Sequence, residues 1–141
     1  MAANATTMLL GAFLLVGCGG ANMKSYTPIS EKTKYPPETL FAAARRALEA
    51  GGHDVIRSDP ETYTLLTKEK EYYVSSVPRL SYKYAWTIVT ADGKLSITVS
   101  CKQNSSMERK AYEDCGDERP ARVIDEQDDL RKAILQRAKK K

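Results

Sequence analysis

Apolar positions along this chain fall into one short continuous run, two stretches with helical spacing and several stretches that alternate with polar residues. The continuous run covers residues 8–16 and carries no charge. Spacing of three and four predicts amphipathic helices over residues 36–50 and 125–139. Alternation predicts strands between the two helices. The pattern therefore predicts the order helix, strands, helix.

The ends of both predicted helices carry the expected signals. Pro36 and Pro37 suit the first turn of the first helix, and Gly51-Gly52 suits its end. The second helix begins with acidic residues and finishes with basic ones, which matches the helix dipole. The predicted apolar stripes are Leu40, Phe41, Ala44, Ala47 and Leu48 in the first helix, and Leu130, Ala133, Ile134 and Ala138 in the second.

Two hairpins are predicted between the helices. Residues 55–56 and 63–67 flank an Asp-Pro turn signal at Asp59-Pro60. Residues 81–90 and 95–103 flank Asp92-Gly93, which is the strongest signal for a two-residue hairpin turn. This register places Ile88 opposite Ile97, Trp86 opposite Val99 and Tyr84 opposite Cys101. It gathers one apolar face of Tyr84, Trp86, Ile88, Leu95, Ile97, Val99 and Cys101, while Ala85 and Val89 fall on the more polar opposite face.

The fold class predicted by these elements is α+β. We expect a four-stranded antiparallel sheet with an N-terminal and a C-terminal helix packed on one face, in the order α-β-β-β-β-α, because this buries both helical stripes. Residues 36–141 would form this single domain. Residues 68–80 are either a strand extending from Tyr72-Tyr73-Val74 or a long loop. The layout loosely resembles the small α+β domains of lipoproteins that serve in outer-membrane assembly.

The continuous apolar run precedes Leu15-Val16-Gly17-Cys18. It is too short to span a bilayer, which takes about 20 residues, and it fits a signal-peptide core. The four residues resemble the lipobox of bacterial lipoproteins. The resemblance implies that residues 1–17 are a signal peptide, that cleavage falls between Gly17 and Cys18, and that the Cys18 thiol and the new amino terminus are acylated. The alternatives are a plain secretory signal cut near Ala12 or Gly17, and a buried N-terminal helix.

A lipid anchor at Cys18 implies an address in the cell envelope, with the bilayer as partner through the acyl chains. Gly19 rather than Asp follows the cysteine, which in the enterobacterial form of the family resembles an outer-membrane lipoprotein facing the periplasm. Residues 18–35 are polar and lack apolar periodicity, so they are predicted to be a flexible tether. Its average span would be roughly 20–25 Å, with a stretched limit of about 55 Å.

Cys101 and Cys115 remain once Cys18 carries lipid, because the chain has three cysteines. An even pair in a compartment that permits disulfides favours a bridge. The main alternative is two free thiols. A zinc site would need two further ligands, and the single histidine, His53, lies far away in the sequence.

Composition and motifs point away from several classes of function. The net charge of +4 comes from 22 basic and 18 acidic residues, which does not suggest a nucleic-acid partner. Motifs for nucleophilic catalysis, phosphate loops, dinucleotides and calcium are absent from the sequence. We therefore expect no cofactor, no metal and no catalytic residue, with His53 in a structural or surface role.

Binding is the remaining kind of activity. The chain has eight tyrosines, several beside lysines, and this pairing suits sugars, peptides or lipid headgroups. The candidate contacts are Tyr72, Tyr73, Tyr82 and Lys83. The sequence thus favours a non-catalytic lipoprotein that docks on another envelope protein or stabilises an assembly. A ligand-binding module that uses a Tyr/Lys-rich face is second, and an unrecognised enzyme is third.

Overall fold

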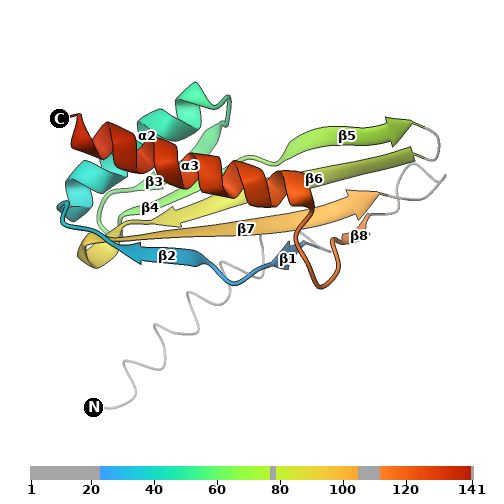
Figure 1. Cartoon of the computed structure of the whole chain (residues 1–141), viewed down its shortest axis with the longest axis horizontal. Helices are drawn as coiled ribbons and strands as arrows, with labels where there is room; N and C mark the ends of the chain where they lie inside the picture. Colours follow the sequence, from blue (N-terminus) through green and yellow to red (C-terminus); the bar gives the residue numbers. More distant parts are fainter. Residues whose placement is uncertain (1–22, 77–78, 105–111, 141) are drawn as a thin grey trace, which may run out of the picture.

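A computed structural model of the chain describes residues 23–76, 79–104 and 112–140 (Figure 1). The described part contains two α-helices and eight strands, and the eight strands form one sheet. The α+β class is confirmed, but the expected count of four strands was too low. In chain order the elements are β1 (Lys24–Ser25), β2 (Ile29–Lys32), α2 (Pro37–Ala50), β3 (Val55–Asp59), β4 (Thr64–Thr67), β5 (Lys70–Ser76), β6 (Arg79–Val89), the 3₁₀ turn η1 (Ala91–Gly93), β7 (Lys94–Asn104), β8 (Glu113–Asp114) and α3 (Ala121–Lys139).

The sheet is built around the two longest strands, β6 and β7, and every strand pairing in it is antiparallel. The main path runs β1-β7-β6-β4-β3. β4 and β5 share the same edge of β6 one after the other, and β2, β1 and β8 share the far edge of β7. Three of the extra strands, β1, β2 and β8, have only two to four residues and show too little alternation to be counted from sequence, whereas β5 is the strand that the sequence offered as one alternative for residues 68–80.

The β6–β7 hairpin has the register expected from the sequence. Ile88 pairs with Ile97, Trp86 with Val99 and Tyr84 with Cys101. At the turn, Asp92 and Gly93 both adopt positive φ, 61° and 69°, which is the backbone that a tight hairpin turn requires. The expected apolar face is buried throughout.

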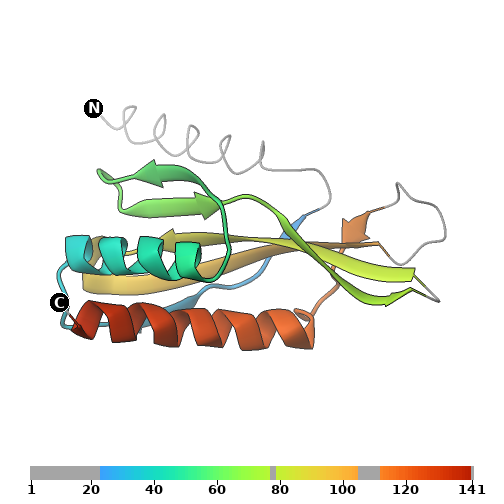
Figure 2. The same ribbon diagram turned by 90° about the horizontal axis from the view of Figure 1, so that it is seen from above.

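Both helices cover that apolar face (Figure 2). The stripe of α2 is buried as expected, with Ala43 added and Phe41 only half-buried at its margin. The helix α3 begins at Ala121, directly after Pro120, and not near Asp125 as the acidic residues indicated. A proline is well suited to the start of a helix, so the helix begins there and the acidic residues occupy its second and third turns. The fully buried Gln127 donates a hydrogen bond of 2.8 Å from its side-chain nitrogen to the Ile97 carbonyl, which ties α3 to the sheet.

Part of the predicted tether is folded. β1 and β2 pair with β7 along Lys24–Ser25 and Ile29–Lys32, and the Thr33 amide donates to the Gly93 carbonyl at 2.9 Å. The free edge of β7 offers unpaired backbone groups, and backbone pairing needs no apolar pattern, so a polar segment can fill it. The folded domain therefore includes β1 and β2 and does not begin at residue 36. The predicted signal peptide, the cleavage site and Cys18 lie outside the described residues.

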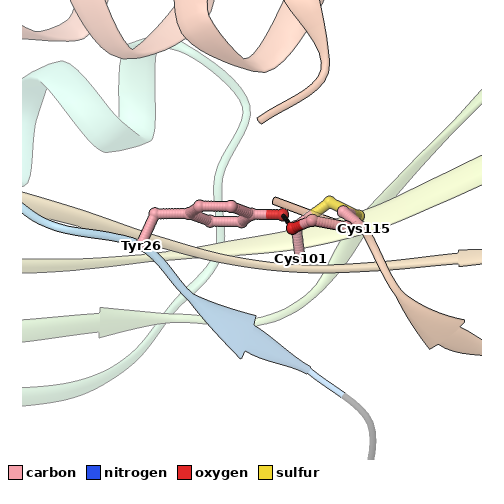
Figure 3. The surroundings of a disulfide bond; sticks show 4 residues. Tyr26, Cys101 and Cys115 are labelled. Atoms are coloured by element: carbon pink, nitrogen blue, oxygen red, sulfur yellow. Dashed lines mark hydrogen bonds between the residues drawn. A yellow bond between two sulfur atoms is a disulfide. The ribbon is translucent and has the colours of Figure 1, made fainter. Parts of the chain in front are cut away.

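Cys101 and Cys115 form a disulfide with a Cα–Cα distance of 5.7 Å (Figure 3). Cys101 is fully buried in β7, and Cys115 directly follows β8. Beside the bridge, the Tyr26 hydroxyl donates to the Gly116 carbonyl at 2.8 Å. The bridge and this hydrogen bond hold the segment before α3 against β7 and against the strand segment that begins the domain.

We predict that loss of the disulfide destabilises the domain without changing its fold. Cross-linking two cysteines with a sequence separation of 14 restricts the unfolded chain, and the loop-entropy model gives about 3 kcal/mol for a loop of this size. In a Cys18→Ser background, the further change Cys115→Ser should lower the free energy of unfolding in urea by about that amount.

The control is reductant, which should lower the stability of the parent protein and leave that of Cys115→Ser unchanged. An equal free-thiol count in the parent before and after reduction, measured in denaturant, would contradict the bridge.

Candidate functional site

The face of the sheet opposite α2 and α3 carries short side chains where its central strands meet. Ala85 and Thr87 lie on this face of β6, and they pair across the hairpin with Ser100 and Thr98 of β7. The same positions alternate with the buried residues of the core, so they point to the opposite side. Short side chains leave space above the strands, and this is where the described residues form a hollow.

A cavity of about 880 Å³ lies over this face. Ile56, Leu66 and Ala85 supply apolar walls, and serine and threonine side chains fill the spaces between them. The volume lies within the range of pockets that hold small ligands, about 300–1,000 Å³. The described lining residues are Met23, Ser25, Ile56, Arg57, Asp59, Thr62, Thr64, Leu66, Thr67, Lys68, Glu69, Glu71, Lys83, Ala85, Trp86, Thr87 and Ser100.

One end of the cavity has a network of paired charges around Tyr112. The Tyr112 hydroxyl donates to Oε2 of Glu71 at 2.9 Å. The ammonium groups of Lys83 and Lys102 lie 4.7 and 5.3 Å from the centre of the Tyr112 ring. Lys102 also forms an ion pair of 3.3 Å with Glu69. These charges are engaged with one another, so this end is better suited to closing the cavity than to acid–base chemistry.

The four predicted ligand contacts do not form one surface, which corrects the expectation of a Tyr/Lys-rich face. Tyr72 and Tyr82 lie on the helix-covered face, where their ring centres are 5.2 Å apart. Tyr73 is 63% exposed and donates to Oε1 of Glu71 on the other face, where Lys83 meets Tyr112. The physical reason is strand alternation, because neighbouring residues in a strand point to opposite faces.

Tyr72 and Tyr82 belong instead to a series of aromatic rings that continues along β6 into the core. The Tyr72 ring lies 5.7 Å from Tyr84, and Tyr84 lies 5.7 Å from Trp86. Burial, followed by the neighbouring Tyr82, raises the pKa of Tyr72 to about 12. Burial and the Glu126 carboxylate raise the pKa of Tyr84 as well. Both hydroxyls therefore stay protonated at neutral pH, and these rings act as packing groups.

His53 lies at the inner end of this series. It is only 8% exposed, and its ring meets Tyr84 and Trp86 edge-on at 6.3 and 6.1 Å. Burial, followed by the charge of Lys70, holds the pKa of His53 below its usual value of 6.5. A buried neutral imidazole among aromatic rings fits a structural role. Within the described ranges, no group of three or more histidine, cysteine, aspartate or glutamate side chains is placed to hold a metal ion.

The residues that line the cavity floor were not singled out from sequence. The available signal was the mixture of Ala85 and Val89 with polar residues on the outer face of the β6–β7 hairpin. Their neighbours in the cavity, Ile56 and Leu66, come from the other hairpin, and only the β4–β6 pairing brings the two hairpins together.

His53 should make the stability of the domain fall in mild acid. Its folded pKa lies below 6.5, so the unfolded chain takes up the proton more readily, and the free energy of unfolding decreases as pH drops through about 6.5. Urea unfolding at pH 7.5 and pH 5.5 should show a smaller difference for His53→Gln than for the wild type. The carboxylates titrate alike in both proteins and cancel in this comparison. An unchanged difference would show that His53 keeps its ordinary pKa.

Comparisons with known proteins bear on the fold. No protein-family model matches the chain, and no curated protein matches it. Among solved structures, a TBP-like protein from Parabacteroides distasonis aligns with a TM-score of 0.53 and 14% identity over 85% of this chain and 95% of that one. A DUF4468 family protein from Bacteroides ovatus aligns with a TM-score of 0.49 and 12% identity over 84% and 88%. At such low identity, the likeness to the TBP-like protein shows a shared α+β fold and nothing about activity.

Proposed function

We propose that the protein is an envelope lipoprotein anchored through acyl chains on Cys18. It would be anchored in the outer membrane and face the periplasm. The support is the apolar run followed by Leu15-Val16-Gly17-Cys18. The disulfide between Cys101 and Cys115 is consistent with a compartment outside the reducing cytoplasm. Within residues 23–76, 79–104 and 112–140, no helix is long and apolar enough to cross a membrane.

The anchor would hold the domain close to the bilayer. Because β1 begins at Lys24, the link between the lipidated residue and the sheet shrinks to residues 19–23. Cys18 lies five positions before Met23, and five residues reach about 17 Å when fully extended. A link this short restricts which faces of the domain can meet the membrane and which can meet a partner.

The function proposed for the domain is non-catalytic docking on another envelope protein. The observation that carries it is the exposure in β5 of Tyr73 at 63% and Val74 at 53%, at the register shift between Tyr73 and Ser75 that interrupts the alternation of the strand. In Figure 1, β5 and the adjoining end of β6 extend past both helices. A contiguous exposed apolar patch marks a surface that another protein covers, and this pair on the projecting β5 is the candidate for such a patch.

Ligand binding is the second candidate function, and the cavity is the observation that favours it. Its apolar walls and paired charges at one end suit a molecule with an apolar portion better than a glycan. The Tyr/Lys face that first suggested a ligand is divided between two sides of the sheet, so the candidate ligand site moves to the cavity. An unrecognised enzyme remains third.

The anchor is tested by Cys18→Ser in the full-length protein. The variant should move from the membrane fraction to the soluble envelope fraction and lose metabolic labelling with fatty acid, because the thiol is the acyl acceptor. Ala21→Ser, which keeps Cys18, is the matched control and should stay in the membrane. Wild-type protein that takes up no fatty acid would refute the lipid anchor.

Docking is tested by affinity purification of the tagged full-length protein from detergent-solubilised membranes. A partner recovered in stoichiometric amount with wild type should be lost with Val74→Ser, since the change removes exposed apolar surface. Ile124→Ser changes an apolar residue that is 39% exposed on α3, and it should leave recovery intact. Equal recovery of the partner with both variants would show that the docking surface lies outside β5. Recovery of the tagged protein without a partner would favour ligand binding.

A further inference from the structure

The cavity opens beside the point where the anchored end of the chain joins the sheet. Met23, the first described residue, lines the cavity, and so does Ser25 in β1. The Ser25 hydroxyl lies 2.8 Å from the Ser100 hydroxyl, which also lines it. The chain segment that follows the proposed lipidation site is therefore part of the cavity wall.

The walls of the cavity are suited to a flexible hydrocarbon. Ile56 is 66% exposed and Leu66 is half-buried, although both are large apolar residues of the sheet. Between them and β1 the floor consists of Ala85, Thr87 and Ser100, whose short side chains leave room for a chain, and the Ser100 hydroxyl is already paired with Ser25. Exposed apolar surface in a hollow is stabilised when an apolar group covers it, by about 25 cal/mol per Å² buried.

We propose that this cavity holds one of the acyl chains carried by Cys18 of the same molecule. The inference rests on the lipid anchor proposed above. An acyl group five positions before Met23 starts within about 17 Å of the cavity wall. Its covalent attachment gives it an effective concentration in the millimolar range, as for modules joined by a short linker.

The number of acyl chains allows this arrangement without loss of the anchor. A lipobox cysteine carries two acyl chains on its diacylglyceryl group and a third on its acylated amino terminus. Two chains suffice for stable membrane attachment, whereas one gives only marginal binding. One chain can therefore occupy the cavity while the other two remain in the bilayer. The domain would then lie with its cavity face toward the membrane and its helices away from it.

The test uses full-length protein from cells grown with a fatty acid that carries a photoreactive diazirine. After purification and irradiation, mass spectrometry identifies which peptide is joined to the peptide that begins at Cys18. We expect an intramolecular cross-link to the peptides that contain Leu66 or Ala85. Ala85→Trp should reduce this product several-fold because the indole fills the floor, and Ala42→Trp, on the exposed side of α2, should leave it unchanged. Ser100→Leu gives a second filling variant if Ala85→Trp does not fold.

The possible outcomes separate this inference from the anchor on which it rests. Wild-type protein with no fatty-acid label would overturn both. Labelled protein whose cross-links lie outside the cavity peptides would overturn the inference and leave the anchor in place. A phospholipid mass on the cavity peptides would identify membrane lipid as the occupant and overturn the intramolecular assignment. A cross-link that persists at full yield in the folded filling variants would place the acyl chain elsewhere.

Discussion

The pairing of β6 with β7 is the interaction on which the rest of the structure depends. Both strands have eleven residues, and the turn at Asp92 and Gly93 sets their register. Because side chains alternate, this one register places Trp86 and Ile97 under the helices and Ala85 and Ser100 on the opposite face. A slip by one residue would expose the core and bury the floor of the cavity. The same hairpin therefore specifies both the hydrophobic core and the candidate site.

The outer edges of β6 and β7 explain why the sheet contains more strands than the two predicted hairpins supply. A strand of eleven residues offers more backbone donors and acceptors than one short neighbour can satisfy. β4 and β5 divide one edge of the hairpin, and the strand segments that begin the domain take the opposite edge together with β8. The disulfide at Cys115 then holds β8 and the start of α3 beside β7. Irregular and polar segments thus become part of the fold through backbone pairing.

Folding of residues 24–32 into the sheet changes how the proposed anchor relates to the domain. A flexible tether of residues 18–35 would leave the domain free to turn in any direction near the bilayer. Under the proposed anchor, a link restricted to residues 19–23 would instead hold the membrane close to Met23, which lines the cavity. The exposed pair Tyr73 and Val74 lies on the projecting β5. In these proposals the membrane would meet the cavity face, and a partner protein would meet β5 beside it, where Tyr73 contacts Glu71 of the cavity lining.

The sequence by itself determined the features that depend on neighbours along the chain. The helical stripe of α2, the turn at Asp92-Gly93, the register of Ile88 with Ile97 and the pairing of Cys101 with Cys115 were all predicted, because local spacing, turn chemistry and cysteine number specify them. Only the tertiary structure decided which strands share an edge, which tyrosines share a face and where Ile56 and Leu66 meet Ala85. These depend on backbone pairing between distant segments, and backbone groups are nearly the same for every residue, so the sequence carries little signal for them.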